Sequence, residues 1–183
     1  MPDRSSLARD LLRRISARQP ACGTTRVLSI DGPSGAGKTS LAHAVVEASG
    51  APVLHLEDLY RGWHGLESAP PAAADVLAAV AVDRVGHAPT WDWVRERLGP
   101  DVTLAPAPLV VVEGVGAGAR TLAPFVSLLV WLDGPEDRRR SRALARDGDT
   151  YAPWWDVWAA QERQHFAREG TRERADLVAE LAG

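Results

Sequence analysis

The stretch VLSIDGPSGAGKTS, residues 27–40, joins an apolar run to the pattern G-x-x-x-x-G-K-[ST] without a departure. An apolar strand before the glycines and an amphipathic helix after them are the context in which this pattern forms a loop around phosphate. Glycine lets the backbone turn tightly and bring its N–H groups close to phosphate oxygens. The stretch therefore predicts a nucleoside-triphosphate site, formed by Gly32, Ser34, Gly35, Ala36, Gly37, Lys38, Thr39 and Ser40.

Lys38 is the one lysine among the 21 lysine and arginine residues of the chain. Because arginine serves everywhere else, the lysine marks a position that requires a compact ammonium group. The planar guanidinium group of arginine is a poor substitute in so tight a loop. We expect Lys38 to contact the β- and γ-phosphates of ATP, and the hydroxyl of Thr39 to bind Mg²⁺.

Composition bounds the class of protein. A chain of 183 residues can bury a sizeable core, and its net charge of −3 gives no basic field for nucleic acid. The single cysteine, Cys22, allows no internal disulfide. No apolar run approaches the roughly 18 residues that a membrane span needs, and the first residues lack the apolar segment of a signal peptide. We therefore expect a cytoplasmic protein with neither a nucleic-acid nor a membrane partner.

Short apolar runs alternate with helical patterns along the chain, which is typical of a parallel sheet with helices on both faces. We expect a single α/β domain, residues 1–183, with the P-loop NTPase fold and a mainly parallel five-stranded sheet in the order 2-3-1-4-5. Residues 1–24 begin with an amphipathic helix, and residues 89–99 are short and mixed. The expected strands are 24–31, 52–58, 108–114, 125–133 and 174–181, and the expected helices are 37–48, 73–85, 134–149 and 153–170.

Carboxylates follow the expected strands at the edge where ligands of such sheets bind. Glu113 follows the run Leu109–Val112 and is predicted to hold Mg²⁺ through water. Asp58 is predicted to accept the proton of an attacking hydroxyl. Asp31 and Asp133 more often cap turns.

Arginines are concentrated in the helix expected over 134–149. Arg138, Arg142 and Arg146 share one face of it, while Arg139 and Arg140 lie off that face. A phosphoryl group in transfer needs positive charge, so we expect Arg142 and Arg146 to supply it from a mobile lid.

Seven tryptophans are an unusual number for this length. Core packing is the default expectation for each. The sharper alternative is that Trp63 and Trp91 stack on a planar acceptor.

Several segments resemble the uridine kinase and phosphoribulokinase group of P-loop kinases. SIDGPSGAGKTSLA resembles the first strand and loop of the group, and RERADLVAE its closing strand. LEDLYRG resembles the segment D-x-F-Y of the group, which implies a catalytic base at Asp58. PTWDWV followed by PAPLVVVEGVGAG resembles its Y-D-F segment and third strand, which implies an acceptor contact at Asp92 and a metal contact at Glu113. RSRALARD resembles its lid, with phosphate contacts implied for Arg142 and Arg146.

The chain departs from the group at the acceptor. The DLYR segment is one residue shorter than usual, Trp91 replaces the tyrosine of Y-D-F, and Glu96 stands where a histidine reads the pyrimidine. The phosphate machinery is thus intact, whereas the residues that read base and sugar are altered. The resemblance implies an acceptor region over 59–107 and a lid over 136–150.

The sequence thus predicts a kinase that transfers the γ-phosphoryl group of ATP to a hydroxyl of a small molecule. The most favoured acceptor is a uridine- or cytidine-like nucleoside. The predicted acceptor contacts are Asp58, Arg61, Trp91 and Asp92.

Two alternatives stay open. The first is a nucleoside monophosphate or dephospho-coenzyme A kinase, for which Arg61, Arg84, Arg95 and Arg97 could bind a phosphorylated acceptor. The second is a non-catalytic ATP-binding regulator. A GTP switch is excluded, because its N-K-x-D motif needs a second lysine. A homodimer stays open as well.

Overall fold

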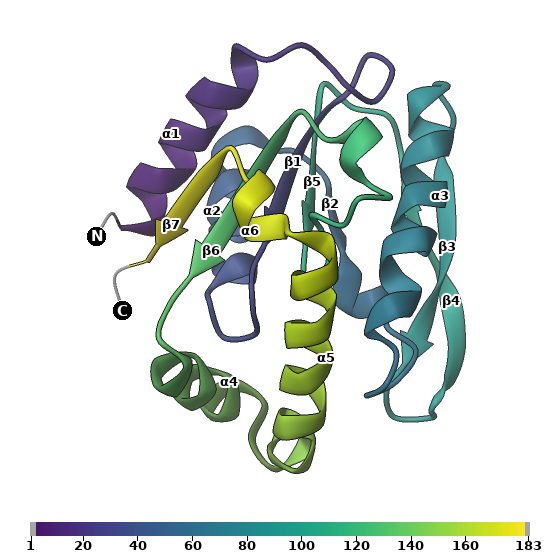
Figure 1. Ribbon diagram of the computed structural model, residues 1–183. Helices are drawn as coiled ribbons and strands as arrows, with labels where there is room; N and C mark the ends of the chain where they lie inside the picture. Colours follow the sequence, from purple (N-terminus) through teal and green to yellow (C-terminus); the bar gives the residue numbers. More distant parts are fainter. Residues whose placement is uncertain (1–2, 182–183) are drawn as a thin grey trace.

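A computed structural model describes residues 3–181, apart from the side chains of Asp147 and Asp149. Its main sheet has five parallel strands in the order β2-β5-β1-β6-β7 (Figure 1). Counted without the separate pair β3 and β4, this is the order 2-3-1-4-5, and the expected α/β fold is confirmed. The strands of this sheet are β1 (Arg26–Asp31), β2 (Val53–His55), β5 (Leu109–Glu113), β6 (Leu128–Asp133) and β7 (Leu177–Glu180).

Helices cover both faces of the sheet, because side chains along each strand point alternately to opposite sides. On β5, Val111 packs into the core shared with α1 and α2, while Val110 and Val112 pack into the core shared with α3 and α5. Figure 1 shows α1 on one side of the sheet and α3 with the hairpin on the other. The helices are α1 (Arg4–Ser16), α2 (Lys38–Ser49), α3 (Ala69–Ala81), α4 (Glu136–Tyr151), α5 (Trp155–Glu169) and α6 (Thr171–Arg174).

The segment expected to be short and mixed is an antiparallel hairpin of β3 (Gly86–Asp92) and β4 (Arg97–Leu104). Its outer face is exposed, so apolar and polar residues alternate only weakly along both strands. The sequence therefore gives no clear signal for either strand. The hairpin packs against α3, mainly through β3.

The second strand is shorter than expected over 52–58. It pairs with β5 only as far as His55, which lies opposite Glu113 at the end of β5. The chain then turns into a single 3₁₀ turn, η1 (Leu56–Leu59), which carries Glu57 and Asp58. Both acids therefore lie beyond the edge of the sheet, on a turn that points them in different directions.

The fourth strand also begins later than expected over 125–133. A 3₁₀ turn, η3 (Ala123–Phe125), precedes it, and β6 begins at Leu128.

Among the residues that the structure describes, no helix is long and apolar enough to cross a lipid bilayer.

Candidate active site

The loop between β1 and α2 wraps the N-terminus of α2, where backbone N–H groups are free of helical partners. Gly35 has φ +76°, and a Cβ atom there would overlap the backbone carbonyl oxygen of Arg139 on α4. Gly37 caps α2 with φ +99°. Only glycine satisfies both the backbone conformation and the close approach of the lid helix, as the sequence motif implies.

Lys38 is almost buried, with 8% of its surface exposed, and its Nζ donates to the carbonyl oxygen of Pro33 at 3.1 Å. Burial lowers the pKa of Lys38, while the nearby carboxylates of Glu162, Glu113 and Asp31 act to raise it. Carboxylates on three different elements therefore favour the charged form of this buried ammonium group.

The residues expected at Mg²⁺ meet at the end of β5. The Thr39 hydroxyl donates to Oε1 of Glu113 at 3.2 Å, and Nδ1 of His55 lies 2.6 Å from the same oxygen. The hydrogen bond with Glu113 raises the pKa of His55. No three His, Cys, Asp or Glu side chains within residues 3–181 form a cluster able to hold a metal alone. Thr39 and Glu113 fit a Mg²⁺ ion that also takes oxygens from phosphate and water.

A cavity of about 490 Å³ joins this loop to the lid and to the segment that follows β2. Nine residues predicted from the sequence line it: Ser34, Gly35, Gly37, Lys38, Thr39, Ser40, Glu113, Arg142 and Arg146. The structure adds a set that the sequence did not single out for this cavity: Glu57, Tyr60, Trp93, Tyr151 and Trp158. Trp63, which the sequence did suggest, lines it as well.

Of the two acids on η1, Glu57 lines this cavity and Asp58 is not among the described lining residues. Asp58 is half-buried. Its pKa is raised by burial and by the charge of Glu113, while the charge of His55 acts to lower it. Counting back from Tyr60, the sequence Glu57-Asp58-Leu59-Tyr60 matches D-x-F-Y with Glu57 at the acid position. That alignment removes the apparent one-residue gap and could have identified Glu57 from sequence.

The other three predicted acceptor residues lie away from the cavity wall. Asp92 accepts the N–H groups of Val94 and Arg95 at 3.1 and 2.9 Å, and its carboxylate also pairs with the Arg95 guanidinium. It therefore forms the turn of the hairpin instead of facing a ligand. Trp91 packs near Gly62, and Arg61 is exposed. Trp93, two residues after Trp91, is the indole of this segment that reaches the cavity.

Helix α4, where the sequence predicts a lid, brings its arginines to the loop unequally. Arg142 and Arg146 line the cavity, as expected, while Arg138 is exposed. Arg139, expected to lie off the functional face, donates to the carbonyl oxygens of Ser34 and Gly134 at 3.0 and 2.9 Å. Arg139 thus ties the lid to the phosphate loop through backbone contacts that no side-chain pattern reveals.

Aromatic rings join the end of α4 to the segment that follows η1, where Trp63 lies. Trp63 stacks on Tyr151, with ring centroids 5.4 Å apart, and on Trp154 at 5.8 Å. Its ring is tilted against that of Trp93, with centroids 4.9 Å apart, and lies edge-on to that of Trp158 at 6.5 Å. Four rings of this cluster line the cavity: Trp63, Trp93, Tyr151 and Trp158.

Polar contacts fix the segment after β5 to the end of β1 and to Tyr60. Asp31, fully buried, accepts the N–H groups of Gly116 and Gly118 and so serves as an anchor for this segment, as expected for a turn cap. Tyr60 donates to the carbonyl oxygen of Val115 at 2.9 Å. The segment therefore cannot shift independently of the cavity wall.

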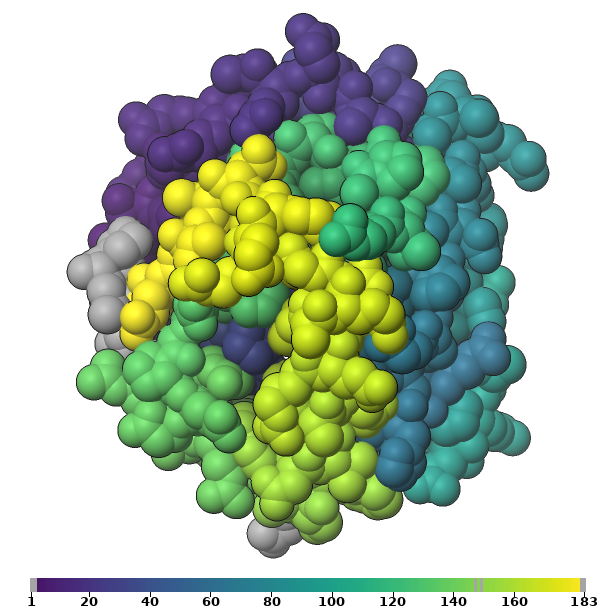
Figure 2. All heavy atoms as spheres, in the orientation of Figure 1, coloured from purple at the N-terminus to yellow at the C-terminus, as the bar shows by residue number. Residues whose placement is uncertain are grey.

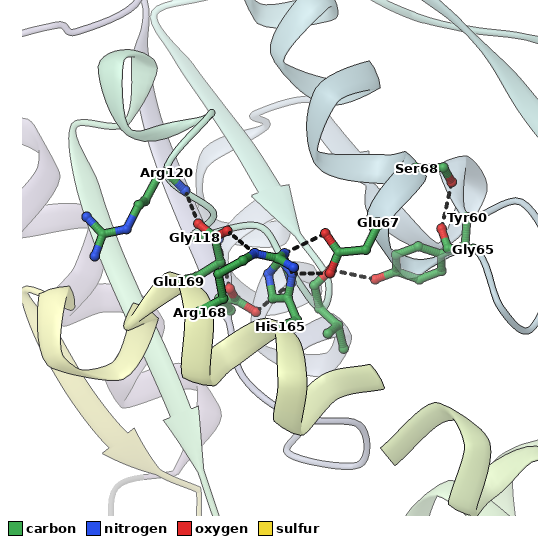
Figure 3. A network of polar contacts seen from close by, with 12 residues as sticks. Tyr60, Gly65, Glu67, Ser68, Gly118, Arg120, His165, Arg168 and Glu169 are labelled. Carbon is green, nitrogen blue, oxygen red and sulfur yellow. Dashed lines mark hydrogen bonds and ion pairs between the residues drawn. The ribbon is translucent and has the colours of Figure 1, made fainter. Parts of the chain in front are cut away.

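On α5, the buried His165 and the exposed Arg168 both contact Glu67 of the acceptor segment, at 2.9 and 2.6 Å (Figure 3). Arg168 also contacts Glu169, which accepts the N–H group of Arg120. These contacts hold α5 beside η2 (Leu66–Ser68), and Trp158 of the same helix lines the cavity.

Comparison with solved structures finds the same fold in two proteins that are described as kinases. One match is a possible uridine kinase from Bacillus stearothermophilus, with TM-score 0.69 and 21% identity over 94% of this chain and 97% of that one. Another is a protein assigned as a fructose transport system kinase from Silicibacter sp. TM1040, with TM-score 0.66 and 18% identity over 98% and 100% of the two chains.

This chain has the fold of the P-loop kinases. The resemblance expected from the sequence is therefore confirmed at the level of the fold. No family model matches the chain, and no curated protein matches it by sequence.

Proposed function

We propose that this protein is an ATP- and Mg²⁺-dependent kinase that phosphorylates a hydroxyl group of a small molecule. The observation that carries the proposal is the single cavity that contains Lys38, the lid arginines and Glu57 together. A phosphate loop alone is consistent with many functions. A carboxylate and an aromatic wall facing that loop supply what a second substrate needs.

Each cavity residue has a role in this proposal. The loop N–H groups and Lys38 hold the phosphates of ATP, which supplies the phosphoryl group. Thr39 and Glu113 would hold Mg²⁺, which would neutralise the negative charge of the phosphates. Arg142 and Arg146 stabilise the negative charge of the phosphoryl group in transfer.

Glu57 orients the acceptor hydroxyl and accepts its proton as the oxygen bonds to the γ-phosphorus and ADP departs. The sequence assigned this role to Asp58, and the experiment below compares the two acids directly.

The charges that line the cavity favour an acceptor without a phosphate. Lys38 belongs to the loop, and Arg142 and Arg146 belong to the lid. The arginines that kept a phosphorylated acceptor open are not among the described lining residues. The aromatic wall suits a flat ring. A nucleoside is therefore the first candidate, and a nucleoside monophosphate the second.

The single buried cysteine fits a reducing cytoplasm.

The test is ATP consumption at fixed Mg²⁺ across nucleosides, nucleoside monophosphates, sugar alcohols and pantothenate-type alcohols. We expect one unphosphorylated, ring-bearing acceptor to stimulate turnover. Tight ATP binding with no stimulation by any acceptor would favour the non-catalytic regulator.

The first variant is Lys38→Ala, which removes the one ammonium group at the phosphates. We expect kcat to fall by about 10³-fold or more, in line with the loss of a charge aimed at the transition state. Circular dichroism should show an intact fold. Wild-type turnover in this variant would contradict the placement of the site.

A further inference from the structure

Glu162 is a buried carboxylate on α5 to which the mechanism above gives no role. It has 4% of its surface exposed, and its Oε1 accepts the N–H group of Ser34 in the phosphate loop at 2.9 Å. The same oxygen accepts the indole N–H of Trp158 at 2.9 Å. One carboxylate oxygen from a distant helix therefore holds both the phosphate loop and a wall of the acceptor cavity.

Glu162 bonds the loop at Ser34, next to Pro33, whose carbonyl oxygen accepts the Lys38 ammonium group. Among the carboxylates that act on Lys38, Glu162 has the largest effect and favours its charged form. Lys38 is nearly buried, and its Nζ is otherwise bonded to a neutral carbonyl oxygen, that of Pro33. A buried ammonium group is costly unless an anion lies near it. Glu162 meets that need from a helix more than a hundred residues away along the chain.

We propose that Glu162 is the counter-anion of the phosphate loop when no nucleotide is bound. It accepts the Ser34 amide and offsets the charge of Lys38, and the phosphates of the nucleotide take over as partners of Lys38 on binding. This inference rests on the proposed function only in requiring that the loop binds a nucleoside triphosphate.

The Glu162 carboxylate and the phosphates of the nucleotide repel each other, so Glu162 weakens nucleotide binding. In the absence of nucleotide, the same carboxylate stabilises the loop. Glu162 also borders a second cavity of about 360 Å³, together with Pro33, Arg139 and Trp131. Figure 2 shows the surface hollowed between α4 and α5, with atoms from the first part of the chain at the bottom. The Glu162 carboxylate therefore lies between the phosphate loop, which it contacts at Ser34, and this second cavity.

The test variant is Glu162→Gln, which keeps the size and an accepting oxygen and removes the charge. Affinity for Mg·ATP is measured by calorimetric titration without any acceptor. We expect binding to tighten by about 3- to 10-fold, as removal of one nearby like charge predicts. Without nucleotide the Tm should fall by roughly 4 °C or more, since Lys38 loses its counter-charge.

At saturating Mg·ATP the Tm gap between Glu162→Gln and wild type should narrow, because the phosphates replace the missing anion. The matched control is Asp156→Asn, which removes an exposed charge from the same helix. Its affinity for Mg·ATP and its Tm, with and without nucleotide, should equal those of wild type. A second control is Glu162→Asp, which keeps the charge and should hold the affinity within about threefold of wild type.

A Tm loss that is equal with and without nucleotide, at unchanged affinity, would show that Glu162 only packs, and would overturn the proposal. Weaker nucleotide binding in Glu162→Gln would overturn it too. If wild type bound no Mg·ATP, the proposed function would fail instead. The Lys38–Glu162 pairing would then be decided by urea denaturation of the single and double variants of Glu162→Gln and Lys38→Met. Additive losses in those variants would refute the pairing.

Discussion

Glu57 and Asp58 are adjacent acids on one 3₁₀ turn, and only Glu57 lines the cavity. Comparison of Glu57→Gln with Asp58→Asn therefore separates the two candidate bases within one segment. We expect kcat to fall by about 10²- to 10⁴-fold in Glu57→Gln, the usual contribution of a general base, and by less than tenfold in Asp58→Asn. Steady-state kinetics with the acceptor from the panel measures both. The reverse order would return the role to Asp58.

At the scale of elements, the phosphate loop and the lid touch through backbone atoms at Gly35. In Gly35→Ala the new Cβ would press on the carbonyl oxygen of Arg139, so α4 must move away from the loop. Gly50 offers a matched control, because its φ of +69° resembles the +76° of Gly35 and nothing lies within 4 Å of its Cβ position.

For Gly35→Ala we expect Mg·ATP binding to weaken at least tenfold, because the arginines of α4 leave the loop. For Gly50→Ala we expect only the cost of a left-handed backbone, about 1–2 kcal/mol, seen as a fall in Tm of roughly 2–8 °C with unchanged binding. Calorimetric titration and thermal unfolding check both. Equal loss of binding in the two variants would show that backbone strain, and not the contact with α4, is responsible.

A second contact between elements is the stack of Trp63 on Tyr151 and Trp154, which joins the acceptor segment to the end of the lid. In Trp63→Ala we expect the KM of the acceptor to rise about tenfold, in proportion to the lost aromatic contact, while the KM of ATP changes by less than about threefold. Trp91→Phe is the control, since Trp91 is absent from the described cavity wall. A larger effect from Trp91→Phe would restore Trp91 as the acceptor contact.

At the scale of the whole molecule, Cys22 reports on global unfolding. It is fully buried in the core shared with α3, and its Sγ donates to the carbonyl oxygen of Leu77 at 3.2 Å. Burial raises the pKa of the Cys22 thiol to about 11. We expect a thiol reagent at pH 8 to label the native protein only at the rate at which the whole domain opens.

The sign of the pH effect follows from the same pKa shift. The folded state binds the Cys22 proton more tightly than the unfolded chain, so this contribution to stability is complete below about pH 8.5. It is lost as the pH rises through about 11. Urea denaturation at several pH values, followed by labelling of Cys22, measures both effects. Fast labelling of the folded protein without urea would show that the core opens locally at this point.

The sequence by itself determined the sheet, the glycine-rich loop and the carboxylate at the end of β5. Repeating apolar runs fix strands that are buried on both faces, and a glycine-rich loop with one lysine has few other uses. Lys38, Thr39 and Glu113 could be located because each lies at a set distance from the end of a strand, where the register of the sheet places it. Helical spacing placed Arg142 and Arg146 on one face with Arg138, and the resemblance to a kinase lid singled out the two that line the cavity.

Only the tertiary structure decided which side chains face the cavity. Glu57 and Asp58, or Trp91 and Trp93, differ by one or two positions on irregular backbone, where no period of 2 or 3.6 says which way a side chain points. Arg139 acts through backbone carbonyl oxygens, which carry no signature in sequence. Glu162 meets Ser34 across 128 residues, a distance that only the packing of α5 against the sheet can close.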